Sequence, residues 1–243
     1  MTMPHKPTAG SPYRPTATPT LGVLMLKTGF PRPPGDVGNP TTWSVPTRFR
    51  VVEAADVASV VKSGPLPLNL LMAFIDAGWA LVEEGVTLIT TSCGFLVTAQ
   101  KALGEALPVP VVTSSLLQIP QLLAGLPQGR RVGVLTFDAR RLSDAQLAAA
   151  GAPPDTPLAG LEDGRELHRV ITQDLRRLDA RAAEADVLAA GAALKAACPD
   201  LGAVVLECTN LSPYRATLAA ALGVPVHDLV TLVETRLGGR RPA

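Results

Sequence analysis

Two cysteines in the chain stand in matching surroundings. Cys93 lies in the segment VTLITTSCGF and Cys208 lies in the segment AVVLECTNLSP. In each segment an apolar run is followed by polar residues, the cysteine and the predicted start of a helix. The partial positive charge and free N–H groups at a helix start lower the pKa of a thiol. The sequence therefore predicts two reactive thiols, which would face one cleft if the halves of the chain are related lobes.

The repeated context carries this prediction, because a lone cysteine is more often a small buried apolar residue than a reactive one. Cys198 is the internal comparison, since it lies in LKAACPD at the end of an alanine-rich helix with no strand before it. We expect Cys198 to be structural. Three cysteines in 243 residues do not make a disulfide scaffold, which favours free thiols, a reducing compartment and a cytoplasmic location.

Other kinds of site find little support in the sequence. No GxGxxG, GxxxxGK or GxSxG motif occurs, so dinucleotide binding, phosphate-loop and serine-hydrolase functions lose their main signals. The three histidines are far apart and there is no CxxC, so we expect no metal site. A formal net charge of +1 and the lack of an apolar window of about 18 residues argue against nucleic acid and membrane partners. The expected partner is a small molecule.

The cysteines must be positioned by strands and helices that alternate along the chain. Short apolar runs alternate with helical stretches from residue 21 onward, which is typical of parallel α/β sheets. Strands are expected at 22–26, 48–53, 86–91, 109–113, 132–136, 203–207 and 224–227. Helices are expected at 68–84, 95–107, 116–123, 143–150, 165–197 and 214–222. Hydrophobic residues make up 47% of the chain, which is enough to cover such strands on both faces.

This pattern predicts an α/β fold of two pseudo-symmetric lobes, each with a parallel sheet flanked by helices, and an active-site cleft between them. The first lobe is expected to contain residues 21–113 and 214–243, and the second lobe residues 114–213. Residues 1–20 include five prolines and are expected to form a disordered tail. Residues 27–46 are rich in proline and glycine and follow the first strand. They predict a loop with a functional or a merely connecting role, because ligands bind at the carboxyl ends of such strands.

The residues around the second cysteine resemble a motif of the aspartate/glutamate racemase superfamily. This superfamily also contains hydantoin racemases, arylmalonate decarboxylases and maleate isomerases. Cys208, Thr209, Asn210 and Pro213 in CTNLSP are similar to its glycine-cysteine-threonine segment followed by a proline. The resemblance covers the chain from Leu21 to about residue 237.

The chain departs from ordinary glutamate racemases at several positions. Around the first cysteine, Ser92 and Gly94 flank Cys93 where amino-acid racemases usually have cysteine-asparagine-threonine, so only the cysteine matches. Phe95 follows where those enzymes help to hold the substrate. Glu207 replaces the usual glycine before the second cysteine, and it could orient a base or cap the next helix. The segments TTSCGFL and ECTN look like those of a branch that is usually labelled only as aspartate/glutamate racemase family proteins.

The resemblance implies cofactor-independent racemisation or epimerisation of a small, amino-acid-like carboxylate. One cysteine thiolate removes the proton beside the carboxylate, and the opposing thiol delivers a proton to the other face. Donors must then hold the carboxylate where negative charge develops. The catalytic candidates are Cys93 and Cys208, and the substrate-binding candidates are Thr28, Ser92, Gly94, Phe95, Thr209 and Asn210.

Three alternatives stay open from the sequence alone. The same scaffold could carry a decarboxylase or a cis-trans isomerase, in which one thiol protonates an enediolate or adds to a double bond. A catalytically inactive carboxylate-binding protein is the alternative from a different class. A homodimer is one possible assembly.

Overall fold

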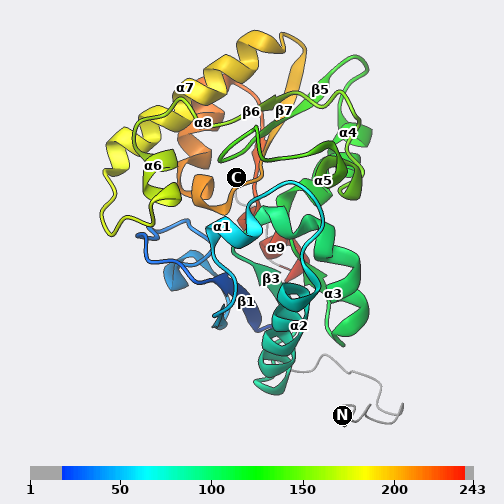
Figure 1. Cartoon of the computed structure of the whole chain (residues 1–243). Helices are drawn as coiled ribbons and strands as arrows, with labels where there is room; N and C mark the ends of the chain where they lie inside the picture. Colours follow the sequence, from blue (N-terminus) through cyan, green and yellow to red (C-terminus); the bar gives the residue numbers. More distant parts are fainter. Residues whose placement is uncertain (1–17, 239–243) are drawn as a thin grey trace.

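The structure is a computed structural model that describes residues 18–238. The part of the expected N-terminal tail before Thr18 lies outside the described residues. Within them, the chain forms two lobes, one above the other in Figure 1, and each lobe is built on a four-stranded sheet. The strands are β1 (Leu21–Leu26), β2 (Thr47–Val52), β3 (Leu88–Thr91), β4 (Val111–Val112), β5 (Arg131–Leu135), β6 (Leu158–Ala159), β7 (Leu201–Leu206) and β8 (Val226–His227).

The two sheets have the same topology. Their strand orders are β2-β1-β3-β4 and β6-β5-β7-β8, and neighbouring strands are parallel throughout. We call the part built on the first sheet the first lobe and the part built on the second sheet the second lobe. The predicted α/β class with two similar lobes is therefore confirmed.

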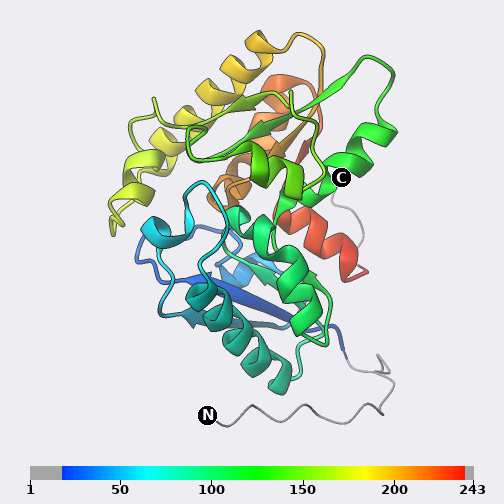
Figure 2. The same cartoon turned by 45° about the vertical axis from the view of Figure 1, so that its right-hand side comes forward.

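Helices cover the sheets on both faces. They are α1 (Val57–Val60), α2 (Leu68–Glu83), α3 (Gln100–Ala106), α4 (Ile119–Gly125), α5 (Asp144–Ala149), α6 (Leu167–Thr172), α7 (Ala180–Ala197), α8 (Arg215–Leu222) and α9 (Leu229–Arg236), with 3-10 helices η1 (Pro40–Thr42), η2 (Gly94–Ala99), η3 (Ser115–Gln118) and η4 (Thr209–Tyr214). In the first lobe α2 and α3 lie over one face of the sheet (Figure 2). No helix among residues 18–238 has the length and apolarity needed to cross a membrane.

Strand β1 shows why both faces of the first sheet must be covered. All six of its residues are buried. Because successive side chains of a strand point to opposite faces, Leu24 packs into the main core whereas Leu21 and Val23 pack against Leu229 and Val233 of α9. The main core is continuous across both lobes, and the face of β1 that packs against α9 belongs to a second, smaller core cluster.

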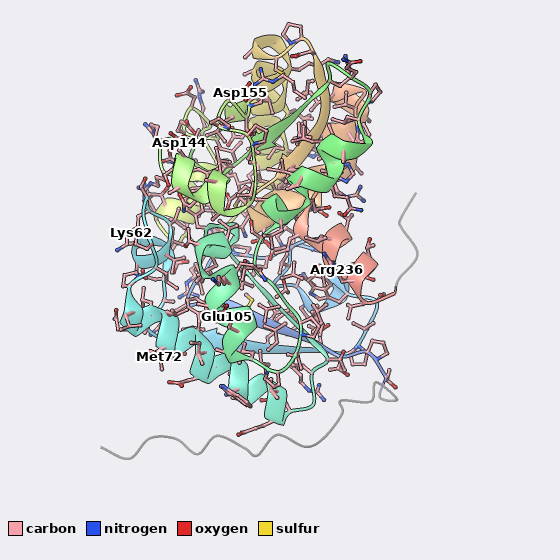
Figure 3. All side chains as sticks on the ribbon, turned by 90° about the vertical axis from the view of Figure 1, so that its right-hand side faces the viewer. Lys62, Met72, Glu105, Asp144, Asp155 and Arg236 are labelled. Carbon is pink, nitrogen blue, oxygen red and sulfur yellow. The ribbon has the colours of Figure 1, made fainter. Side chains whose placement is uncertain are left out.

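The chain returns to the first lobe later than the sequence indicated. Strand β8 pairs with β7 in the second sheet, so residues 214–227 belong with the second lobe and the expected boundary at 214 is wrong. The return comes at Asp228, whose side chain caps α9. Figure 3 shows α9, with Arg236 near its end, beside the junction of the lobes.

The long helix expected over 165–197 is two helices. Between α6 and α7, Asp174 has a φ of 49°, a left-handed conformation that helix interiors do not contain and that aspartate tolerates better than most residues. Asp179 then starts α7 by accepting hydrogen bonds from the N–H groups of Arg181 and Ala182. Strand β6 and helices α1 and α9 were not expected. Of these, β6 and α1 are very short and carry no periodic pattern.

Candidate functional site

The two cysteines occupy equivalent positions in the two lobes. Thr91 at the end of β3 pairs with Leu24, and Leu206 at the end of β7 pairs with Leu135. Two residues after each of these positions comes a cysteine with an extended backbone, which is the cap of a 3-10 helix: Cys93 precedes η2 and Cys208 precedes η4. The repeated topology therefore aims both strand ends at the same region between the lobes.

A pocket of about 360 Å³, its open mouth included, lies at these strand ends. It contains every site residue that the sequence singled out: Thr28, Ser92, Cys93, Gly94, Phe95, Cys208, Thr209 and Asn210. The sequence had not singled out Leu26, Phe30, Arg32, Val57, Val61, Phe137 and Ile171, and had left the role of Glu207 open; these also line the pocket. The walls are mostly apolar, and the polar groups gather around the two thiols.

Two of the expected substrate-binding hydroxyls instead hold the backbone in place. The Ser92 hydroxyl accepts a hydrogen bond from the N–H of Leu26 at 2.9 Å. The Thr209 hydroxyl donates to the carbonyl of Ser92 at 2.7 Å, which ties the residue after one cysteine to the residue before the other. These bonds fix the relative position of the two cysteine turns. The backbone N–H groups at the starts of η2 and η4 have no partner within their own helix, so they are candidates to face a ligand.

Residues 27–46 supply a charged network that sequence reasoning missed. The Arg32 guanidinium pairs with the buried Asp36 carboxylate at 2.9 Å, and it also donates to the Thr28 hydroxyl at 3.0 Å. Asp36 accepts a further hydrogen bond from the Asn210 amide at 2.7 Å. Arg32 lines the pocket with donors to spare, because a guanidinium carries five N–H groups. The only signal in the sequence was the position of this loop after the first strand.

The same loop is fastened to the second lobe. The Asp174 carboxylate accepts hydrogen bonds from the N–H groups of Gly29 at 2.6 Å and of Phe30 at 3.0 Å. Asp174 is the residue whose left-handed backbone ends α6. The break between α6 and α7 thus has a purpose at the site, because it presents a carboxylate that holds the loop next to the pocket.

Burial reverses the sign that the sequence predicted for the thiol pKa values. Desolvation raises the pKa of Cys93 and of Cys208, and the negative charge of Glu207 raises both further. The N–H groups of Phe95 and Asn210 act in the lowering direction, as the sequence argument expected, but desolvation outweighs them. Both cysteines are therefore thiols at neutral pH in the unliganded protein, and a thiolate must form with the help of a ligand or a base.

Glu207 is the third ionisable group at the thiols. Its side chain is fully buried, and one carboxylate oxygen, Oε2, accepts a hydrogen bond from the Thr136 hydroxyl at 2.6 Å. The other oxygen, Oε1, has no hydrogen-bond partner among the described residues. Desolvation raises the pKa of Glu207 to about 7, although the bond from Thr136 acts in the lowering direction.

The structure supports different reactivities for the three free cysteines. Cys208 is half-buried and Cys93 is buried but faces the pocket, whereas Cys198 is outside the pocket and its thiol donates to Asp200 at 3.1 Å. We expect iodoacetamide to modify Cys208 first, Cys93 next and Cys198 last, with rates that rise with pH because the thiol pKa values are raised. Peptide mapping by mass spectrometry measures this order, and equal labelling of all three in the folded protein would contradict it.

Metal binding finds no support in the described part of the chain. Residues 18–238 contain no group of three histidine, cysteine, aspartate or glutamate side chains that could hold an ion. His168 instead stacks on Phe137 with ring centroids 4.7 Å apart and contacts the Asp138 carboxylate at 3.3 Å. It supports the wall of the pocket from behind.

Several known proteins are similar to this chain in sequence. The sequence profile of the Asp/Glu/hydantoin racemase family matches residues 53–233. Dimethylsulfoniopropionate lyase 3 of Emiliania huxleyi (strain CCMP1516) is 30% identical over 227 residues, which cover 90% of this chain and 59% of that protein. The dimethylsulfoniopropionate lyase of Durusdinium sp. clade D is 28% identical over 90% of this chain and 74% of that protein. The chain thus spans a little over half the length of the first of these relatives.

Solved structures share the fold at low sequence identity. Allantoin racemase from Klebsiella pneumoniae has a TM-score of 0.63 and 17% identity, with 92% of this chain and 90% of that chain covered. Arylmalonate decarboxylase has a TM-score of 0.58 and 20% identity, with 86% of each chain covered. One scaffold therefore serves racemases and decarboxylases, and the scaffold alone does not decide the reaction.

Proposed function

The chain belongs to the Asp/Glu/hydantoin racemase family, and we propose that it is a cofactor-independent lyase acting on a small carboxylate. In this reaction a cysteine thiolate, formed by loss of the thiol proton to solvent when the substrate binds, takes a proton from the α-carbon, and the substrate then loses a leaving group from its β-carbon. The observation that supports the proton abstraction is the pair of thiols at equivalent strand ends on one pocket. The sequence relatives named as lyases favour elimination over racemisation as the outcome.

The site offers what the first step of such a reaction needs. Removal of an α-proton places negative charge on the carboxylate as an enediolate, which must be stabilised where it develops. The N–H groups at the starts of η2 and η4 and the spare donors of Arg32 are the candidates for this role. The second thiol can donate a hydrogen bond to the same charge. Asp36 keeps Arg32 in place, so the guanidinium need not reorganise during the reaction.

The second step needs only a good leaving group. When the electron pair of the broken C–H bond forms the α–β double bond, the β-substituent departs with the electrons of its own bond. For dimethylsulfoniopropionate the products would be acrylate and dimethyl sulfide, and the proton would remain on the cysteine until solvent removes it. No electron acceptor enters this balance, which agrees with a reaction that runs without a cofactor.

Racemisation or epimerisation is the second candidate, and the presence of both thiols favours it. Two acids on opposite faces of one carbon are what inversion requires, because one removes the proton and the other supplies a new one. A single-thiol reaction such as decarboxylation would leave one of the two cysteines without a role. The family description, which covers aspartate, glutamate and hydantoin racemases, supports the same alternative.

Proton NMR of the purified protein in D₂O distinguishes these outcomes. With dimethylsulfoniopropionate we expect acrylate to accumulate and dimethyl sulfide to appear in the headspace. Exchange of the α-proton and inversion of L-aspartate, L-glutamate or a 5-substituted hydantoin, without elimination, would favour the racemase instead. Loss of carbon dioxide from an arylmalonate would indicate a decarboxylase. If none of these carboxylates exchanges or reacts, the lyase proposal fails.

A further inference from the structure

One ionisable group in the pocket has a neutral residue at the equivalent position of the other lobe. Glu207 precedes Cys208 as Ser92 precedes Cys93, so the two residues occupy equivalent positions in the two lobes. Ser92 is neutral and its hydroxyl is used by the backbone of Leu26. Glu207 lines the pocket, and its carboxylate has one buried oxygen, Oε1, without a hydrogen-bond partner among the described residues. The symmetry of the site is therefore broken by a negative charge on one side.

Residues 18–238 leave space for this carboxylate but offer it no counter-charge. A side chain on Gly94 would overlap Oε1 and the carbonyl oxygen of Glu207, so the glycine leaves room for the carboxylate. Arg32 lines the same pocket, but its guanidinium is already paired with Asp36. Behind Phe137, Asp138 is paired with Arg140 and His168. The remaining ionisable neighbours of Glu207 are the thiols of Cys93 and Cys208, which are neutral.

Apolar and aromatic side chains make up much of the wall of the pocket that Glu207 lines. The pocket walls include Phe95, Phe137, Val57, Val61 and Ile171. Such walls offer few acceptors to an ammonium group, which carries three N–H donors that all need partners. They suit an onium group, which has a positive charge and no N–H donor, because aromatic faces attract cations and methyl groups pack against apolar surface.

We propose that Glu207 is the counter-charge for a cationic group of the substrate, and that it makes the pocket selective for carboxylates bearing an onium group. This inference rests on the proposed lyase for the position of the carboxylate, which would lie at Arg32 and the N–H groups of η2 and η4. The onium group would then lie at Glu207 between the aromatic walls. A carboxylate ligand of the same shape but without the positive group would leave the charge of Glu207 buried and uncompensated, which costs binding energy.

The ionisation behaviour of the site agrees with this assignment. Burial without a counter-charge is what raises the pKa of Glu207 to about 7, and a bound cation would lower it again. The same positive charge would lower the pKa values of the two thiols, which burial and Glu207 hold high. An onium substrate would thus supply the charge that a thiolate needs at this site.

Isothermal titration calorimetry with three matched ligands tests the assignment. The first probe is 3-(trimethylammonio)propionate. The second, 4,4-dimethylpentanoate, keeps the carboxylate and replaces the onium group by a neutral tert-butyl group, and we call it the neutral isostere. The third, 2-amino-4,4-dimethylpentanoate, moves the positive charge to the α-carbon. We expect the onium ligand to bind the wild-type protein most tightly at pH 8. Its affinity should fall about tenfold between pH 8 and pH 6, because Glu207 takes up a proton in this range. The neutral isostere should not show this fall.

Two variants assign the effect to Glu207. Glu207→Gln keeps the shape and removes the charge, so it should weaken the onium ligand on the order of 100-fold at pH 8 without weakening the neutral isostere. Thr136→Val keeps the charge and removes the bond to Oε2. It should raise the pKa of Glu207 and move the affinity change of the onium ligand to higher pH.

Binding outcomes and catalytic outcomes can be told apart in these experiments. If Glu207→Gln weakens the onium ligand and the isostere equally, Glu207 only shapes the pocket and the inference is overturned. Tighter binding of the α-ammonium ligand than of the onium ligand also overturns it, in favour of an amino-acid substrate. Failure of the lyase proposal would show as absence of acrylate, and it would leave these binding differences unchanged.

Discussion

Replacing either Cys93 or Cys208 by serine is expected to lower elimination by at least about 100-fold. The cysteine whose thiolate acts as base contributes roughly 10²- to 10⁴-fold to the rate as a positioned proton acceptor. Serine cannot replace it, because a hydroxyl ionises far less readily than a thiol. The other thiol donates to the developing enediolate, and loss of one such donor costs about 10²- to 10³-fold. Because the two act in one step, the double variant should be little slower than the slower single variant. Headspace analysis of dimethyl sulfide gives these rates.

Cys198→Ser is the matched control for both substitutions. Cys198 lies at the end of α7 outside the pocket, so its replacement should leave the rate within about twofold if the protein folds. Should Cys93→Ser retain wild-type turnover while Cys208→Ser destroys it, a one-thiol mechanism of the decarboxylase or isomerase kind explains the site better. If neither substitution affects a confirmed activity, the cysteine mechanism is wrong.

The same variants also separate elimination from racemisation. A racemase needs both thiols for net inversion, so each single variant should lose inversion for either enantiomer. Each should still exchange the α-proton of the one enantiomer whose proton faces the remaining thiol. The two variants should therefore prefer opposite enantiomers in D₂O, which proton NMR detects directly.

Gly94→Ala is also expected to lower both the reaction rate and the stability of the protein. The added Cβ would overlap the backbone carbonyl oxygen of Glu207 and its Oε1, and the carbonyl cannot move without moving β7. We expect η2 to be displaced from η4, which changes the relative position of the two cysteines. A misplacement of about 1 Å is enough to reduce the rate about 100-fold, and overpacking of this kind destabilises a protein by about 1–3 kcal/mol. Kinetics and chemical denaturation measure the two effects.

Gly104→Ala provides the control for the glycine substitution. Gly104 lies within α3, is exposed, and has no atom closer than 4.0 Å to an added Cβ. Alanine should stabilise this helix by up to about 1 kcal/mol and leave activity unchanged. Wild-type activity in Gly94→Ala would show that the contact between the two cysteine turns is not needed for the reaction.

The sequence predicted the parts of the fold that depend on buried strands. Continuous apolar runs such as 201–206 have the length and composition of strands covered on both faces, and they place the cysteines at strand ends. Strand β8 was located correctly but assigned to the wrong lobe, because a two-residue strand such as Val226–His227 does not reveal its neighbour. The break at Asp174 was missed because the helical spacing of apolar residues continues to Leu175 and Leu178.

The candidate site could be predicted only where residues follow strands directly. Cys93 and Cys208 met that condition. Arg32 and Asp36 lie in an irregular loop, where no periodicity indicates which side chains point inward. The predicted shift of the thiol pKa values had the wrong sign. A helix start is visible in a sequence, whereas the depth of burial and the position of the Glu207 charge beside both sulfurs emerge only from the tertiary structure.

The most direct test of the central claim is a crystal structure of the protein with 3-(trimethylammonio)propionate, whose amine leaves more slowly than a sulfide. The claim is that the two cysteines flank the carbon from which the proton is taken. We expect the ligand's carboxylate at Arg32 and its α-carbon about 3–3.5 Å from the Sγ of Cys93 or Cys208, with the other sulfur on the opposite side. A ligand whose α-carbon lies beyond about 6 Å from both sulfurs, too far for proton transfer without an intervening group, would contradict the claim.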